Sequence, residues 1–340
     1  MAFLARVKRK LRSWLESGEL TNRERNLLGR VEKLESRLKE ARQQIHDIPK
    51  AVRHELRGDL QVLKRVNSEV RRLDRSRKIN STFALHIANA GSESRIGSEL
   101  HRHELQIYSQ NGEDGIFLYI FDKIGITNRR FVEIGAGGLE NNTNNLFFNY
   151  GWSGYWLDLD QDSMDRLASY VERNFPSRRE NYRIYVGRVT PENINELVGD
   201  YCEGEDPDLL TIDVDSYDGQ LLRALSVVQP RVLGCEYNGA LGLRNKLVPY
   251  RADFSRKDHE RYYYGASLPA LAKIAEAKGY SLIGCDSQGV NCFFVRDDCL
   301  GNAFPALPTE EAFVPNRRYA IKSDLDAQWA LVKNFPFEEA

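Results

Sequence analysis

Polar side chains follow two apolar stretches in the second half of the chain. Asp213 and Asp215 lie in "DLLTIDVDSYD", and Glu236 and Asn238 lie in "RVLGCEYNG". Residues two apart on a strand share a face, and neighbouring strands lie about 5 Å apart, so adjacent strands would bring these oxygens together. Asp213, Glu236 and Asn238 could then hold a hard cation such as Mg²⁺. Alternatively, one carboxylate among Asp213, Asp215 and Glu236 could act as a general base, or Asp215 could simply cap the next helix.

A glycine-rich turn follows another apolar stretch, in "FVEIGAGGLENNTNN". Gly135 and Gly137 would let the backbone turn tightly and come close to a ligand. The spacing departs from G-x-G-x-x-G, because Glu140 stands where the third glycine would be. A carboxylate there would repel a pyrophosphate, which counts against NAD and FAD. A cationic ligand with an amino-acid tail would tolerate it.

The next apolar stretches indicate what else meets this turn. "WLDLD" places Asp158 about twenty residues after the glycines, the usual position of an acid that binds ribose hydroxyls. Asp160 could share that role or cap the following helix. The stretch "YVGRVT" has no acid for an adenine amine, so backbone groups near Arg188 and Val189 would have to serve.

The elements that must position these residues alternate between strands and helices. Helices are expected at Ser163–Asn174 and Gln220–Val228, and alternation of this kind predicts parallel strands joined by crossovers. A helix over Ser267–Lys278, with Gly279 as its C-cap, precedes "YSLIGCD" and "NCFFVRD", which read as a hairpin. The expected strands before it are Arg130–Ile134, Gly154–Leu159, Arg183–Val186, Leu209–Ile212 and Val232–Cys235.

The sequence therefore predicts an α/β fold with a seven-stranded, Rossmann-like sheet that closes on an antiparallel hairpin. That is the order of class I S-adenosylmethionine-dependent methyltransferases, whereas a dinucleotide-binding domain more often ends in a parallel strand. The chain also resembles FkbM-type methyltransferases, which often occur among bacterial surface-polysaccharide enzymes. The resemblance covers residues 105 to about 300 and rests on "YSQNGEDGI", "FVEIGAGGLENNTNNL", "GWSGYWLDLD", "DLLTIDVDSYD", "CEYN", "VPY", "YYGASL" and "GVNCFFV".

The resemblance implies S-adenosylmethionine as the cofactor. Asn142 or Thr143 would contact its methionine part, and the N-terminal segment would fold over it. "IDVDSYD" is also similar to the D-x-D-x-Y run of metal-dependent sugar O-methyltransferases, in which acids at these strand ends hold magnesium. Glu236 and Asn238 replace a second Asp pair, so the need for Mg²⁺ and its ligands stay open. The N-terminal segment would be formed by Gln110, Glu113 and Asp114. The other implied cofactor contacts are Gln110 and Glu113 from it, together with Glu133, Gly135, Gly137 and Asp158.

The acceptor is expected in the irregular stretch before the last helix. Aromatic faces and a few polar groups suit a sugar, and this stretch carries Arg251, His259 and three tyrosines in a row, Tyr262, Tyr263 and Tyr264. Two of the tyrosines could instead be core residues. The predicted activity is O-methylation of a sugar hydroxyl in bacterial surface polysaccharide, such as O-antigen or capsule. The acceptor, the methylated position and any effect on chain growth stay open.

The N-terminal part of the chain has a different pattern. Residues 1–20 are expected to form a basic amphipathic helix that could contact an anionic membrane surface or pack against a partner. Residues 21–78 carry heptad-spaced apolar residues from Val31 onward, which predict a coiled coil and a homo-oligomer, without deciding between dimer and trimer. Residues 79–104 are expected to be a hinge, and residues 105–340 the methyltransferase-like domain.

Composition limits the remaining possibilities. Lys and Arg number 48 and Asp and Glu 49, so the bulk has no preference for polyanions, and no nucleic-acid partner is expected. The five cysteines form no C-x-x-C pair, which argues against a zinc site or a disulfide scaffold. Neither a signal peptide nor a membrane-spanning run is apparent. The expected location is cytoplasmic, with peripheral contact at the inner face of the cytoplasmic membrane left open.

Two rival functions remain. The chain could be an oligomeric scaffold that recruits glycosyltransferases to a membrane, with a globular domain that is inactive or only binds cofactor. The acids kept at four strand ends argue against this. An NAD-dependent oxidoreductase would need a Tyr-x-x-x-Lys pair or similar apparatus, which is not found in the expected place.

Overall fold

The computed structural model describes residues 99–254, 256, 261–316 and 324–340. The chain divides into two compact units, Met1–Asn80 and Ser81–Ala340. The predicted amphipathic helix, coiled coil and most of the hinge lie outside the described residues and stay predictions. Leu100 is the first described residue that is buried in the globular unit, and it lies five residues before the predicted start of the domain.

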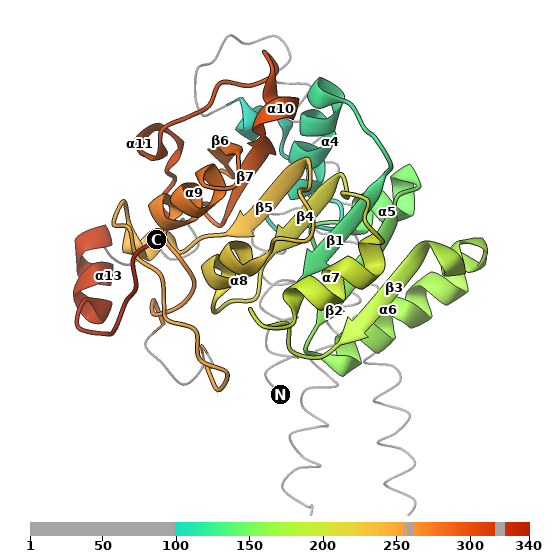
Figure 1. Cartoon of the computed structure of the whole chain (residues 1–340), viewed down its shortest axis with the longest axis horizontal. Coiled ribbons are helices and arrows are strands. Elements are labelled where there is room, and N and C mark those ends of the chain that lie inside the picture. Colours follow the sequence, from blue (N-terminus) through green and yellow to red (C-terminus); the bar gives the residue numbers. More distant parts are fainter. Residues whose placement is uncertain (1–98, 255, 257–260, 317–323) are drawn as a thin grey trace, which may run out of the picture. The chain divides into compact units, whose positions relative to one another are not determined.

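A seven-stranded sheet forms the centre of this unit, in the order β3-β2-β1-β4-β5-β7-β6 (Figure 1). Only β7 runs antiparallel to its neighbours, β5 and β6. The predicted seven-stranded sheet with its terminal hairpin is therefore confirmed. The strands are β1 (Arg130–Ile134), β2 (Ser153–Asp158), β3 (Tyr182–Val186), β4 (Leu209–Ile212), β5 (Val232–Glu236), β6 (Tyr280–Cys285) and β7 (Asn291–Arg296).

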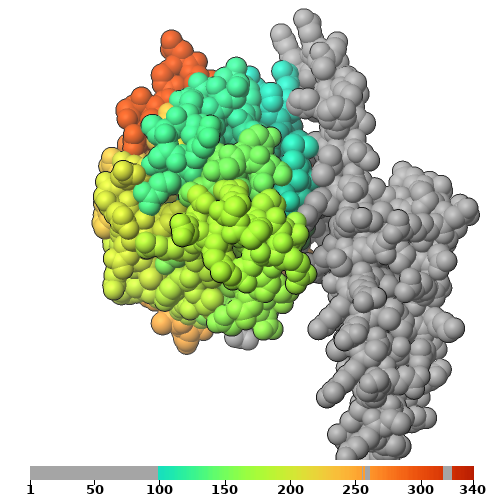
Figure 2. Space-filling view, turned by 90° about the vertical axis from the view of Figure 1, so that its right-hand side faces the viewer, coloured from blue at the N-terminus to red at the C-terminus, as the bar shows by residue number. Residues whose placement is uncertain are grey.

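Helices cover both faces of the sheet. Side chains alternate along β1, so Phe131 packs in one core layer while Val132 and Ile134 pack in the other. The Phe131 layer holds α4 (Glu113–Ile124), α5 (Asn144–Tyr150) and α6 (Gln161–Asn174). The opposite layer holds α7 (Ile194–Cys202), α8 (Asp218–Ala224) and α9 (Leu268–Glu276). Figure 2 shows one side of the unit, where residues coloured teal to yellow form most of the surface and orange residues lie at its upper left and lower edge.

All three expected helices form, with boundaries that differ from the expectation by at most four residues. Helix α8 ends at Ala224 because Leu225 takes an extended backbone, four residues before the predicted end. Helix α9 begins at Leu268, with the Ser267 hydroxyl accepting a hydrogen bond from the Ala270 amide as its N-cap. Gly279 lies beyond the C-cap, with a φ of +81°.

Shorter elements complete the described unit. A small apolar cluster containing Phe254, Tyr262, Tyr263 and Tyr264 packs beside α13 (Leu325–Val332). Among the described residues, no helix is both long enough and apolar enough to cross a membrane. The remaining elements are η2 (Leu100–His103), η3 (Pro176–Asn181), η4 (Gly239–Leu241), α10 (Asp297–Leu300) and α11 (Thr309–Ala312).

Candidate active site

A cavity of about 510 Å³ opens at the carboxyl ends of the parallel strands. It lies where β1 and β4 are neighbours. The strand order reverses at this point, because β2 and β3 follow β1 on one side and β4 and β5 lie on the other. Ligands of open α/β sheets bind at such a point. The predicted residues Gln110, Glu113, Gly135, Gly137 and Asn142 all line this cavity.

The turn after β1 requires glycine at its first position. Gly135 has a φ of +88°, and a Cβ there would lie 1.7 Å from the carbonyl oxygen of Asp213 at the end of β4. The amide of Asp213 donates to the carbonyl of Ile134 at 2.8 Å. The ends of β1 and β4 therefore touch through their backbones, which sets the floor of the cavity.

Glu133 shapes the loop that follows this turn. Its carboxylate accepts hydrogen bonds from the Asn142 amide at 2.8 Å and from the Thr143 hydroxyl. Thr143 also accepts from the Trp156 indole, is fully buried and lies outside the cavity wall. Burial raises the pKa of Glu133 to about 8 although these hydrogen bonds oppose the rise. Glu133 and Thr143 hold the loop. Of the two predicted methionine contacts, Asn142 lines the cavity and Thr143 does not.

Asp158 and Asp160 take different roles at the end of β2. Asp158 lines the cavity, and its carboxylate accepts from the amides of Gly137 and Asp160, both at 2.7 Å. Asp160 caps α6 by accepting from the Asp162 amide at 3.1 Å and the Ser163 hydroxyl at 2.6 Å. Asp160 is not in the cavity wall, so the helix-cap alternative describes it.

The residues beside Asp158 in the cavity wall include Arg188 and Val189, which the sequence indicates, and Leu159 and Gly187, which it does not. Leu159 lines the cavity and is 60% exposed, an unusual position for a large apolar side chain. Gly187, Arg188 and Val189 follow β3 in the wall, and the Tyr217 hydroxyl donates to the Val189 carbonyl at 2.8 Å. An apolar residue directly after the β2 acid is a signal that sequence reading could have used.

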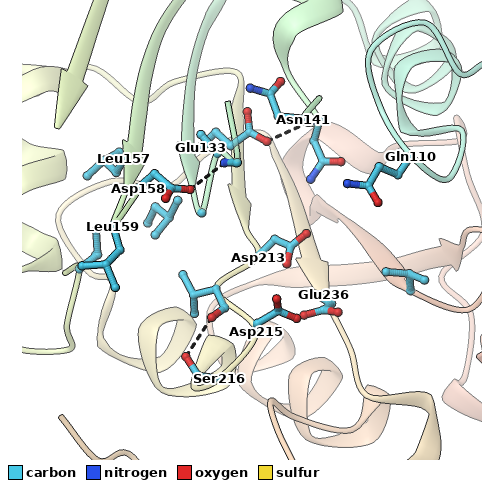
Figure 3. Close-up of a pocket in the computed structure, with 18 of the residues that line it drawn as sticks. Gln110, Glu133, Asn141, Leu157, Asp158, Leu159, Asp213, Asp215, Ser216 and Glu236 are labelled. Atoms are coloured by element: carbon cyan, nitrogen blue, oxygen red, sulfur yellow. Dashed lines mark hydrogen bonds between the residues drawn. The ribbon is translucent and has the colours of Figure 1, made fainter. Parts of the chain in front are cut away.

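Three carboxylates converge below the β1 loop (Figure 3). Asp213, Asp215 and Glu236 each offer an oxygen, and these atoms all lie within 4.8 Å of one another. Asp215 has a φ of +58°, which is uncommon for a residue with a side chain. The structure thus brings the predicted catalytic acids together.

Asn238 does not belong to this cluster. Its side-chain oxygen accepts from the Ala240 amide at 3.0 Å, and its nitrogen donates to the carbonyls of Tyr262 and Tyr264 at 2.8 Å. These bonds hold the chain after β5, away from the cavity wall. We therefore correct the candidate metal set from Asp213, Glu236 and Asn238 to one in which Asp215 replaces Asn238.

The electrostatics of the cluster favour a proton or a cation. Burial, followed by the charge of Asp215, raises the pKa of Asp213, and a hydrogen bond with Glu236 partly offsets the rise. Burial and Asp213 raise the pKa of Glu236. Within the described part of the chain, Glu236 Oε2 has no hydrogen-bond partner. Three oxygen ligands and an unsatisfied buried oxygen fit a hard divalent cation, and they fit a shared proton equally well.

The predicted acceptor residues are divided between cavity, core and surface. Tyr264 lines the cavity, and the Arg256 guanidinium lies 3.6 Å from its ring centre while pairing with Asp215. Tyr263 donates to the Pro336 carbonyl at 2.6 Å inside the apolar cluster that also buries Tyr262. Arg251 is exposed and pairs with Asp253. The fifth predicted acceptor residue, His259, lies outside the described residues.

The N-terminal segment reaches the cavity through Gln110, Asn111 and Glu113. Asp114 is not in the cavity wall and instead holds the backbone of this segment. One of its oxygens accepts from the amides of Ile107, Tyr108 and Ser109 at 2.6 to 2.8 Å. Burial raises the pKa of Asp114 to about 7, against the effect of these bonds.

The strand order with its antiparallel β7 gives this chain the class I methyltransferase fold. No protein-family model matches the chain, and no curated protein does either. The chain is similar to the methyltransferase domain of a bacterial CtHen1, with 12% identity over 54% of this chain and 96% of that one and a TM-score of 0.36.

Two other solved structures show a comparable likeness. Cofactor-bound Rv0187 from MTB has 13% identity over 65% of this chain and 89% of its own, with a TM-score of 0.35. The N-terminal domain of EvdMO1, in the presence of SAH and D-fucose, has 14% identity over 55% of this chain and 81% of its own, with a TM-score of 0.35.

Proposed function

We propose that this protein is an S-adenosylmethionine-dependent methyltransferase. The observation that carries the proposal is the position of Asp158, at the end of β2 and hydrogen-bonded to the Gly137 amide in the turn after β1. A carboxylate at this point can accept from both ribose hydroxyls of a nucleoside. The adjoining turn brings bare backbone to the same ligand, because Gly135 and Gly137 have no side chains.

The charge of the cavity supports a cationic cofactor over a dinucleotide. Seven of the lining side chains are acidic, and two, Arg188 and Arg256, are basic. Even with Glu133 neutral and one proton shared by Asp213 and Glu236, the acidic side chains outnumber the two basic ones. Such a wall would repel a pyrophosphate and attract a sulfonium or an ammonium group. Glu140, at the position of the missing third glycine, belongs to this wall.

Each part of the cofactor has a matching part of the cavity. Leu159 and Val189 offer apolar surface for the adenine, and Asp158 would bind the ribose. Gln110 lies at the opposite side of the cavity from Asp158 and Leu159, beyond Glu133 and Asn141 (Figure 3). The methionine half would therefore extend toward Gln110 and Asn142.

The acid cluster would prepare the acceptor. S-adenosylmethionine, when bound, supplies an electrophilic methyl group. Asp213 and Glu236 hydrogen-bond to each other, so the pair shares one proton that neither carboxyl group loses easily. In this singly protonated pair, the carboxylate that is ionised can accept the proton of an acceptor hydroxyl as the hydroxyl oxygen bonds to the methyl group. The remaining contribution of the protein is to hold the two reactants in line.

Asp213, Asp215 and Glu236 would hold Mg²⁺ where the reaction uses a metal, and the ion would lower the pKa of a bound hydroxyl. The acceptor we propose is a sugar hydroxyl of a bacterial surface glycan or its precursor. Tyr264 lies in the wall with the Arg256 guanidinium over its ring, and Ser216 and Asn316 are polar groups that line the same cavity. The resemblance to FkbM-type enzymes supports this acceptor class.

Calorimetric titration with S-adenosylhomocysteine, with and without Mg²⁺, tests the proposal. We expect binding by the wild type and about 10- to 100-fold weaker binding by Asp158→Ala, because a hydrogen bond to a charged group is lost. Asp165→Ala, on the exposed side of α6, is the matched control and should bind normally. An absence of binding by the wild type would contradict the proposal and favour the scaffold.

A further inference from the structure

The segment before α4 is held against the cavity by a buried carboxylate. We call residues 104–112 the strap. Glu113, 1% exposed, accepts hydrogen bonds from both the amide and the side-chain nitrogen of Asn111, each at 2.7 Å. These two bonds fix the part of the strap that contributes Gln110 and Asn111 to the cavity wall.

Glu113 is itself held by a residue 178 positions away. The side-chain nitrogen of Asn291, the first residue of β7, donates to Glu113 Oε1 at 2.5 Å. Asn291 is 4% exposed, and its backbone amide donates to Asp286 at the other end of the hairpin turn. It also stands opposite Glu236 in the β5–β7 register, so its backbone position is set by the sheet.

The other end of the strap is fastened to the same turn. The Ser287 amide donates to Glu104 Oε1 at 2.6 Å, and its hydroxyl donates to Oε2 at 2.7 Å. Between these points the strap carries a β-bridge from Leu105 to Glu113. Hydrogen bonds to two carboxylates, Glu104 and Glu113, thus connect the strap and the start of α4 to the hairpin between β6 and β7.

We propose that Asn291 is a positioning residue for cofactor binding. Through Glu113 it holds Gln110 and Asn111 against the end of the cavity that receives the methionine half. We call the hydrogen bonds between the hairpin and these two carboxylates the latch. This inference rests on the proposed function for the identity of the ligand. The latch itself rests only on the contacts of Glu104, Glu113, Ser287 and Asn291.

Removing the Asn291 nitrogen leaves Glu113 buried with one donor fewer, which weakens its hold on the strap. In Asn291→Ala, we expect faster hydrogen exchange across residues 105–112 in the ligand-free protein. We also expect affinity for S-adenosylhomocysteine to fall about tenfold, while affinity for 5′-methylthioadenosine, which lacks the amino-acid part, stays within twofold. Ser287→Ala removes the hydroxyl that donates to Glu104 and accepts from the Gln288 side chain, while the Ser287 amide still donates to Glu104. It should show the same selectivity with a smaller loss.

Exposed Asn174→Ala is the matched control, since its nitrogen donates only to the Tyr170 carbonyl on α6. An unchanged exchange rate in the strap would overturn the latch, as would an equal loss for both ligands. If Asn291→Ala does not fold, Ser287→Ala decides on the same criteria. Failure of the wild type to bind either ligand would refute the proposed function, and the exchange comparison would still decide the latch.

Discussion

At the scale of single residues, Asp215 is shared between two kinds of partner. Its carboxylate pairs with Arg256 and also lies in the three-acid cluster that could hold a cation. The Asp215 side chain is 60% exposed and that of Arg256 23% exposed, so solvent screens the pair. Such pairs contribute at most about 1 kcal/mol. A divalent cation would therefore compete with the guanidinium for this oxygen without a large penalty.

This competition predicts the effect of Arg256→Ala. Because a positive charge and a rival for Asp215 are both removed, we expect Mn²⁺ to bind about two- to fivefold more tightly. Mn²⁺ titration followed by electron paramagnetic resonance measures this. Arg251→Ala, which breaks an exposed pair with Asp253 outside the cavity wall, should leave the affinity unchanged. Weaker or unaltered Mn²⁺ binding in Arg256→Ala would show that the two cations do not compete.

At the scale of elements, the contact between the ends of β1 and β4 is made by backbone alone. Asp213 contributes its carbonyl oxygen to this contact and its carboxylate to the acid cluster. Any displacement of the β1 turn is therefore transmitted to the site. A turn with a φ of +88° and no room for a Cβ cannot adjust locally.

We predict that Gly135→Ala loses S-adenosylhomocysteine binding and lowers the thermal midpoint by several degrees. A Cβ at 1.7 Å from the Asp213 oxygen must push the two strand ends apart, and the left-handed backbone adds strain. Calorimetry and thermal melting measure the two effects. Gly125→Ala is the control, since its φ is +74° but nothing lies near its Cβ position. Gly135→Ala behaving like this control would contradict the close contact.

At the scale of the whole molecule, buried acids make stability depend on pH. Burial raises the pKa of Asp114 and Asp218 to about 7, and that of Glu133 and Asp286 to about 8. In an unfolded chain such carboxyls titrate near pH 4. Between these values the folded protein binds more protons than the unfolded chain. The free energy of unfolding therefore decreases as pH rises from about 4 to about 8.

Glu133→Gln should reduce this dependence. Its amide can accept from the Asn142 amide and donate to the Thr143 hydroxyl, so the loop contacts are kept while one titrating group is removed. We expect the thermal midpoint of the wild type to decrease as the pH is raised from 5 to 8, and that of Glu133→Gln to decrease less. Exposed Glu172→Gln should follow the wild type. Equal slopes for wild type and Glu133→Gln would show that Glu133 is ionised throughout this range.

The sequence by itself determined the sheet and the places of its acids. Apolar runs such as Arg130–Ile134 and Leu209–Ile212 are local signals, and the short turn between the last two runs required a hairpin. Because parallel strands end at one edge, Asp158, Asp213 and Glu236 had to lie there. Alternation along a strand is a property of neighbouring residues, so no distant contact was needed to infer it.

Only the tertiary structure decided which polar groups remain available to a ligand. Asn238 and Asp160 follow their strands much as Asp213 and Asp158 do, yet both are occupied by nearby backbone groups. Tyr263 and Tyr264 are adjacent in sequence and share the apolar cluster, yet of the two Tyr264 alone also lines the cavity. The bond from Asn291 to Glu113 joins residues 178 positions apart. Hydrogen-bond partners beyond a strand end depend on how distant segments pack, and a local sequence pattern carries no record of that.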